Sequence, residues 1–276
     1  MIEETTSSPG RKSKRIKSVE IGYRVLLAVQ RGPGAVKLSE IAKRCGLTSG
    51  AAHNYIASLV NTGLVEQEDR GRYRLGPSAF ALSLASFRQL NGYDVLRDEA
   101  RGLHLLTGQS TAVAVWSQGG PVSVYIQRSV NVGLFEFRSG HIPMLSSGAG
   151  LVFMAYLPEE QTRRLIELEL EAMGNSKDSP EELIARARAE VLPVGYACYH
   201  YSEPTPYALS IPVQTEDDRI PFVLSIVVHQ PADPTTSETW LPALREAAYR
   251  ASLLLSRADS TGPRSNMSRE LVGSCQ

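Results

Sequence analysis

The chain has 276 residues, of which 42% are hydrophobic and 21% are charged, and its formal net charge is zero. This length suits two domains, and the composition is that of an ordinary globular protein. No segment reaches the ~18 consecutive apolar residues that a membrane-spanning helix needs, and the polar start of the chain lacks the apolar core of a secretory signal. Three distant cysteines, Cys45, Cys198 and Cys275, do not suggest a disulfide framework and favour a reducing cytoplasm.

Charge is distributed unevenly along the chain. Residues 1–76 hold 13 Lys and Arg against 7 Asp and Glu, a net charge of +6, whereas the rest of the chain has a net charge of −6. A basic first quarter is what a surface that binds nucleic-acid phosphates needs. A basic tail that only improves solubility would give the same charge, so this observation alone leaves both interpretations open.

The first part of the chain predicts a polar tail followed by three short helices. Residues 1–17 are polar and rich in Lys and Arg, so we expect this tail to be disordered. Apolar residues then recur at helical spacing in three successive segments. The expected limits are Ser18 as N-cap and the Gly32-Pro33-Gly34 turn for the first helix, Ser39 and Gly46 for the second, and Thr48 or Ser49 and Thr62-Gly63 for the third.

A β-hairpin is predicted after the third helix, with a tight charged turn at its centre. In its second strand Tyr73 and Leu75 alternate with Arg72 and Arg74, so one face should be apolar and the other cationic. The expected strands are residues 64–67 and 72–75.

Three helices with a tight glycine turn before the third, followed by a basic hairpin, are typical of a winged helix-turn-helix. In such a module the third helix enters the major groove of DNA, and the hairpin arginines reach phosphates or the minor groove. The residues expected to contact DNA are Thr48, Ser49, Gly50, His53, Asn54, Arg70, Arg72 and Arg74. A winged helix that binds protein instead is the alternative, which the basic charge and the arginines disfavour.

After residue 76 the pattern becomes a longer alternation of helices and strands. A helix with an apolar stripe, interrupted at Asn91-Gly92, predicts a linker that also pairs subunits. Further helices are expected over 95–106, 148–156, 159–173, 180–191 and 237–256, and strands over 111–116, 122–128, 133–138, 196–201, 207–213 and 222–229. This order predicts an α+β domain in which helices flank an antiparallel sheet.

Five segments carry a family resemblance that covers roughly residues 18–256. They are SVEIGYRVLLAV, LSEIAKRCGL, HNYIASLVNTGLVE and GRYRLGPSAFALS in the first domain, and SGHIPMLSSGAGLVFMAYLPEE in the second. In these segments the chain resembles the IclR family of bacterial transcription regulators. The resemblance implies a GAF-like effector-binding domain, homodimers often paired into homotetramers, double-stranded operator DNA as a partner, and small organic acids as effectors. It also implies a cytoplasmic repressor or activator, most often of a catabolic operon.

The resemblance and the pattern together divide the chain into five parts. They are a disordered basic tail (1–17), a winged helix-turn-helix DNA-binding domain (18–76), a linker helix (77–93), an effector-binding and oligomerisation domain (94–258) and a disordered tail (259–276).

The chain departs from the family pattern at several positions. Family members usually carry a basic residue where Ser49 stands and an Arg where Asn54 stands, so we expect weaker phosphate contacts through this helix. Leu151 replaces the Lys that usually follows Gly-Ala-Gly, and the Tyr- and His-rich run 197–201 replaces acidic residues. This run predicts an aromatic or larger effector.

The small-residue turn 146–150 predicts an effector site on physical grounds. It opens a helix, and the free N–H groups at a helix N-terminus favour an anion such as a carboxylate. The family resemblance adds further residues on the facing strands and in the preceding loop. The expected effector contacts are Ile142, Ser147, Gly148, Ala149, Tyr199, His200, Ala208, Ser210, Ser225 and Val227. Alternatively, Gly148, Ala149 and Gly150 are small only so that the helix can pack on the sheet.

Cys198 and His200 are the one pair that suggests other chemistry. They lie two residues apart on a predicted strand and therefore share a face, as a metal-binding pair or a nucleophile and base would. Zinc needs three or four ligands, and the sequence has no second cluster, so we expect no metal, no cofactor and no enzymatic activity. Two alternatives to a responsive regulator stay open: a constitutive DNA binder with a non-responsive sensor domain, and an enzyme that uses this pair.

Overall fold

The computed structural model describes residues 16–30, 32, 34–69, 71–117, 119–129, 140–174, 177–201, 206–214, 222–228 and 239–261. It divides into two compact units, residues 1–90 and 91–276. Arg70, the strand expected over 133–138, and most of the two predicted tails lie outside the described residues. Within the described ranges, no helix is both long enough and apolar enough to cross a membrane.

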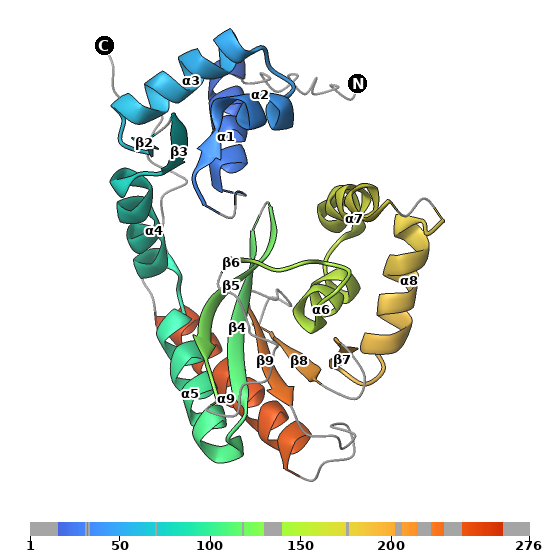
Figure 1. Ribbon diagram of the computed structural model, residues 1–276. Coiled ribbons are helices and arrows are strands. Elements are labelled where there is room, and N and C mark those ends of the chain that lie inside the picture. The colour runs from blue at the N-terminus through green and yellow to red at the C-terminus, as the bar shows by residue number, and fades with distance from the viewer. Residues whose placement is uncertain are drawn as a thin grey trace, which may run out of the picture. The chain divides into compact units, whose positions relative to one another are not determined.

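The N-terminal unit contains a winged helix (Figure 1). Its helices are α1 (Lys17–Gln30), α2 (Leu38–Cys45), α3 (Ser49–Asn61) and α4 (Pro77–Gln89), and its strands are β1 (Val36–Lys37), β2 (Val65–Glu68) and β3 (Arg72–Leu75). The three antiparallel strands pair in the order β1-β3-β2. The hairpin is thus confirmed, but β1 was not predicted, because two residues are too short to show a period-two pattern.

Helices α1, α2 and α3 bury a shared apolar core with β1, β2 and β3. Val25, Val29, Ile41, Ile56 and Val65 are all buried in one cluster, as the helical periodicity requires. Leu47, directly after the turn that ends α2, packs against the same cluster. The apolar faces of three short helices are therefore stabilised by one another rather than by intrinsic helix propensity.

The turns around α2 and α3 follow the predicted chemistry in part. Gly46 has a φ of 62°, the left-handed conformation expected where α2 ends. Thr48 is the N-cap of α3, and its hydroxyl accepts a hydrogen bond from the Ala51 amide at 3.3 Å. The N-caps predicted at Ser18 and Ser39 are wrong, because both residues lie inside helices. For α2 the reason is tertiary: β1 holds Lys37 extended, so the helix begins directly after it.

The C-terminal unit confirms the predicted α+β class. Its six antiparallel strands are β4 (Ser110–Ser117), β5 (Gly120–Gln127), β6 (Gly140–His141), β7 (Ala197–His200), β8 (Tyr207–Val213) and β9 (Phe222–Val228). They pair in the order β6-β5-β4-β9-β8-β7. The helices are α5 (Tyr93–Thr107), α6 (Gly148–Tyr156), α7 (Glu159–Met173), α8 (Pro180–Val191) and α9 (Trp240–Thr261). α9 continues to Thr261, so the first three residues of the segment predicted to be a disordered tail are helical.

The two faces of this sheet carry different helices (Figure 1). α5 and α9 pack together on one face, and α6 packs on the other with α7 and α8 behind it. The alternation of side chains along β9 agrees with this assignment of helices to the two faces. Val223 lies in the core with α6, whereas the next residue back, Phe222, lies near Leu255 of α9.

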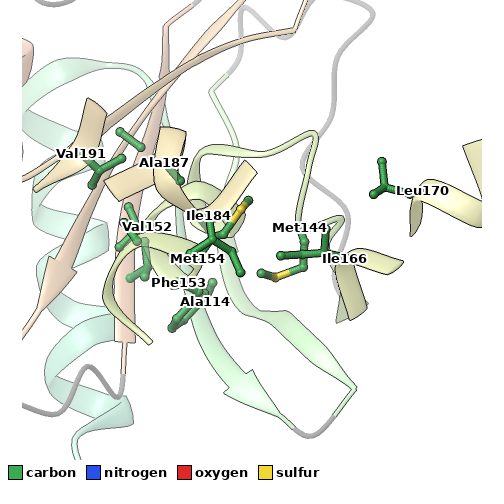
Figure 2. Close-up of a cluster of buried hydrophobic side chains, with 14 residues drawn as sticks. Ala114, Met144, Val152, Phe153, Met154, Ile166, Leu170, Ile184, Ala187 and Val191 are labelled. Atoms are coloured by element: carbon green, nitrogen blue, oxygen red, sulfur yellow. The ribbon is translucent and has the colours of Figure 1, made fainter. Parts of the chain in front are cut away.

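Apolar side chains surround helix α6 on almost every side. Figure 2 shows Val152, Phe153 and Met154 of α6 packed among residues of the neighbouring helices, strand and loop. Because α6 is covered on nearly all sides, its sequence shows no amphipathic stripe. The N-terminus of this enclosed helix packs against the sheet, with Gly148 beside Ser210 and Ala208.

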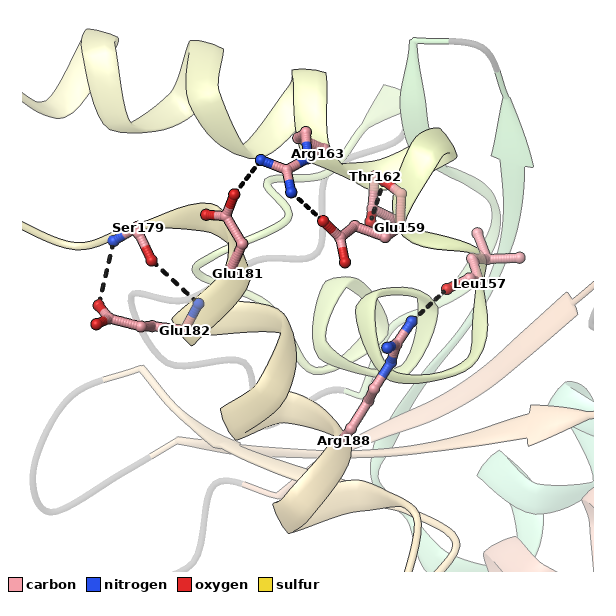
Figure 3. Close-up of polar contacts among 8 residues, drawn as sticks. All are labelled: Leu157, Glu159, Thr162, Arg163, Ser179, Glu181, Glu182 and Arg188. Atoms are coloured by element: carbon pink, nitrogen blue, oxygen red, sulfur yellow. Dashed lines mark hydrogen bonds and ion pairs between the residues drawn. The ribbon is translucent and has the colours of Figure 1, made fainter.

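Polar contacts fix α7 and α8 around this core (Figure 3). Arg163 of α7 bridges Glu159 in its own helix and Glu181 of α8. Ser179 and Glu182 form a capping box at the start of α8, in which each side chain bonds the backbone of the other. Arg188 donates to the Leu157 carbonyl at 3.3 Å, where α6 ends.

Candidate functional site

Helix α3 presents a polar face to solvent. Ala52 and Ile56 are buried, whereas the residues expected to contact DNA on this helix, Ser49, Gly50, His53 and Asn54, are all exposed. A side chain added at Gly50 would meet open space within 4 Å. The first turn of α3 contains no acidic residue, so nothing in it opposes an anion at the free backbone N–H groups of this helix end.

The hairpin is less cationic than its sequence suggests. Cross-strand register places Glu66 opposite Arg74 and Glu68 opposite Arg72. The Arg74 Nε lies 2.5 Å from Glu66 Oε1 and 3.0 Å from Glu68 Oε1, so two carboxylates engage this guanidinium. The face predicted to be cationic therefore also carries two acids, which only the strand pairing reveals.

Arg72 and Lys37 supply the remaining positive charge of the hairpin face. β1 pairs Lys37 with Arg72, and both side chains are exposed. In the part of the chain that the structure describes, no ion pair involves either residue. Lys37 was missed by the sequence analysis because its strand was not recognised.

The loop before α6 is fixed by two polar side chains. The Ser147 hydroxyl accepts from the Gly150 amide at 2.9 Å, capping α6, and donates to the Pro143 carbonyl at 2.6 Å. The Glu169 carboxylate of α7 accepts from the Met144 amide at 2.7 Å and the Leu145 amide at 3.0 Å. Glu169 gave no signal in the sequence, where it reads as part of the polar face of an amphipathic helix.

The pairing of β7, β8 and β9 places most of the expected effector contacts on the α6 face of the sheet. Ala208 pairs with Tyr199 and Val227, and Ser210 pairs with Ser225. The buried hydroxyls of Ser210 and Ser225 lie 2.8 Å apart and hydrogen-bond each other. These five residues therefore form one surface, which faces the N-terminus of α6.

Gly148 lies directly against this surface. A Cβ at Gly148 would stand 2.5 Å from Ser210 Oγ, and one at Gly150 would stand 2.2 Å from the Met144 carbonyl oxygen. Close packing is thus a sufficient reason for both glycines to be small. Ala149 is buried, and Ile142 packs at the edge of the adjoining apolar core.

His200 does not join this group. It pairs with Tyr207, one position out of phase with Tyr199, so alternation directs it to the opposite face, where its ring stacks on Tyr207 with centroids 3.9 Å apart. The expectation that His200 contacts the same ligand as Ser210 conflicts with this register. Cys198 shares the His200 face and is exposed, and no cluster of three metal-binding side chains occurs among the described residues.

Tyr201 is an additional residue at the α6 N-terminus. Its hydroxyl lies beside the backbone amide of Gly148, and its ring meets Tyr199 edge-on with centroids 4.9 Å apart. Burial raises the pKa of Tyr201 to about 12, so the phenol is neutral at physiological pH. A neutral oxygen of the chain itself therefore lies beside the amide at which an anion was expected.

Ser123 is a second polar group that the sequence analysis missed. It pairs with Ala114, a member of the α6-side core, so it lies on that same face. Ser123 is 4% exposed, and its hydroxyl has no hydrogen-bond partner within the described residues. A buried hydroxyl without a partner is costly, so it favours a bound polar atom nearby.

Comparisons with known proteins agree on one family. The model of the IclR helix-turn-helix domain matches residues 18–69. The Escherichia coli protein named transcriptional repressor IclR is 26% identical over 156 residues, which cover 55% of this chain and 57% of that protein. The match thus spans little more than half the length of that relative.

Solved structures show the same fold along most of the chain. An IclR transcriptional regulator from Alicyclobacillus acidocaldarius has a TM-score of 0.69 at 24% identity and covers 88% of this chain and 100% of its own. An IclR homologue from Microbacterium hydrocarbonoxydans, complexed with 4-hydroxybenzoate, has a TM-score of 0.66 at 23% identity, with coverages of 87% and 99%.

Proposed function

Because the chain belongs to the IclR family, we propose that it is a transcription regulator that binds operator DNA and responds to a small organic acid. The observation that carries the proposal is the exposed polar face of α3, held by a buried core in a winged helix of this family. His53 and Asn54 read base edges in the major groove, and the Thr48–Gly50 end of the helix approaches a phosphate.

The effector binds between the α6 N-terminus and the sheet. Gly148 and Ala149 present backbone N–H groups, and Ser210 and Ser225 present hydroxyls that can exchange their mutual bond for a ligand. A carboxylate is the group that suits these donors. The rings of Tyr199 and Tyr201 favour an aromatic body for this acid, and the 4-hydroxybenzoate of the Microbacterium homologue is an example of that class.

Helix α4 pairs two copies of the chain. It exposes Phe80 at 66% and Leu82 at 62%, and Leu84 is also exposed. Apolar side chains exposed around a helix in this way are typical of a subunit interface. A dimer presents two recognition helices to a partly palindromic operator. Effector binding then favours one arrangement of the pair and changes its affinity for DNA, as a population shift does.

A constitutive DNA binder is the second candidate, and one observation favours it. The Tyr201 hydroxyl lies beside the Gly148 amide, and Ser210 fills the space beside the Gly148 Cα. A ligand must therefore displace these groups before it reaches the helix end. Thermal unfolding with and without 4-hydroxybenzoate separates the candidates, because a ligand at ~100 times its Kd stabilises the folded state by about 2.7 kcal/mol.

A gel-shift titration tests the proposed function. The full chain is titrated on the intergenic DNA beside its own gene at two salt concentrations, with and without 4-hydroxybenzoate. Saturable binding that resists competitor DNA, and that the acid changes, supports the proposal. Binding no tighter than to random DNA contradicts it. Gly148→Val should retain DNA binding and lose the response to the acid.

A further inference from the structure

A groove opens on the opposite side of the C-terminal unit, between α5 and β5. It has a volume of about 340 Å³ and is lined by Arg97, Arg101, His104, Leu105, Tyr125 and Gln127. The α5 residues recur at helical spacing, so they form one side of the groove. Tyr125 and Gln127 pair with Val113 and Thr111 of β4, which places them on the sheet face turned away from α6.

Two residues that line the groove are held in place by their neighbours. Arg97 bonds Asp94 at 2.6 Å and Asp98 at 3.0 Å, so its guanidinium is largely neutralised. His104 Nδ1 lies 2.7 Å from the Gln109 carbonyl oxygen. Because a carbonyl oxygen only accepts hydrogen bonds, His104 Nδ1 carries the proton. This hydrogen bond fixes the orientation of the ring, which lines one side of the groove.

Two donors remain for a ligand. Arg101 is exposed, and the structure of the described residues shows no ion pair for it. The Tyr125 hydroxyl donates to Gln127 Oε1 at 3.2 Å, which turns the amide N–H groups of Gln127 toward other acceptors. A guanidinium and an amide that both donate suit the two oxygens of a carboxylate. Leu105, at 74% exposed, and the ring of Tyr125 offer apolar contact beside them.

We propose that the groove between α5 and β5 is a second ligand site, which binds a small organic carboxylate with an apolar body. The carboxylate bonds Arg101 and Gln127, and the apolar body lies against Leu105 and Tyr125. The volume of the groove falls within the range of small-molecule sites. The proposal does not depend on the α6 site, from which the sheet separates it, or on DNA binding.

Calorimetric titration of the full chain with sodium benzoate tests this site. The variants are Arg101→Gln and Gln127→Leu, and the control is Arg186→Gln, which removes an exposed arginine of α8 in the same unit. We expect Arg101→Gln to weaken one binding event per chain by about tenfold to a hundredfold, the usual loss for a charged hydrogen bond. Gln127→Leu weakens the same event, and Arg186→Gln leaves it unchanged.

Three results would overturn the proposal. The first is an equal benzoate titration in Arg101→Gln and Arg186→Gln. The second is inorganic phosphate binding as tightly as benzoate, which would make the groove a general anion site. The third is a smaller assembly of Arg101→Gln in sedimentation velocity, which would assign the groove to an acidic side chain of a second copy. Because no DNA is present, failure here leaves the gel-shift result untouched, and the reverse also holds.

Discussion

Replacing Glu66 and Glu68 by glutamine should tighten DNA binding, because both acids lie beside the cations of the hairpin face. In the free protein these two carboxylates engage Arg74 at 2.5 and 3.0 Å. Both acids would also face the phosphates that Arg72 and Lys37 approach. The double variant removes two negative charges and frees one guanidinium, while the exposed ion pairs that it loses contribute only about 0–1 kcal/mol to stability.

The magnitude follows from counterion release. One added phosphate contact steepens the dependence of log affinity on log salt by about 0.9. The affinity ratio of the double variant to the wild type should therefore grow by about 1.9-fold for each halving of the salt concentration. Because phosphate contacts carry no sequence information, the ratio should be the same on two unrelated duplexes.

Fluorescence anisotropy over a salt series on both duplexes measures this effect. Glu167→Gln is the matched control, because it breaks a similar exposed ion pair, with Arg164, in the other unit. An unchanged salt slope together with equal or weaker affinity in the double variant would refute the reasoning, since Arg74 would then not face DNA.

Four further outcomes are expected. Asn54→Ala should alter the preferred operator sequence in footprints while leaving the salt slope unchanged, because base contacts rather than phosphate contacts are lost. Tyr201→Phe should tighten 4-hydroxybenzoate binding measured by calorimetry, because its hydroxyl no longer competes for the Gly148 amide; weaker binding would mean that the hydroxyl contacts the acid. Leu82→Glu should shift the protein toward monomer in sedimentation velocity and make its Tm independent of protein concentration, because this exposed side chain contributes to association rather than to the core. Phe153→Ala should lower the free energy of unfolding in urea by about 3–5 kcal/mol, because its side chain is fully buried against Trp116.

Local sequence determined most of the elements of this protein. Helices 148–156, 159–173 and 180–191 have the predicted limits, because Pro, Ser or Gly stands at or within two residues of each end. Strand 207–213 also has the predicted limits, and Pro206 precedes it. The glycine turn at Gly46 was also predicted, and the cap at Thr48 was one of the two predicted, since each depends on the chemistry of one residue and its immediate neighbours. The same local signals identified the loop at Gly148 and the hairpin arginines as candidate sites.

Tertiary structure decided which of these residues meet. Cross-strand register brought Glu66 to Arg74 and placed Tyr199 rather than His200 on the α6 face of the sheet, and a shift of one position would reverse both results. Packing of α7 brought Glu169 to the amides of Met144 and Leu145, more than 20 residues away. These contacts join segments whose separate patterns carry no information about one another, so their partners follow only from the folded sheet and the helices packed on it.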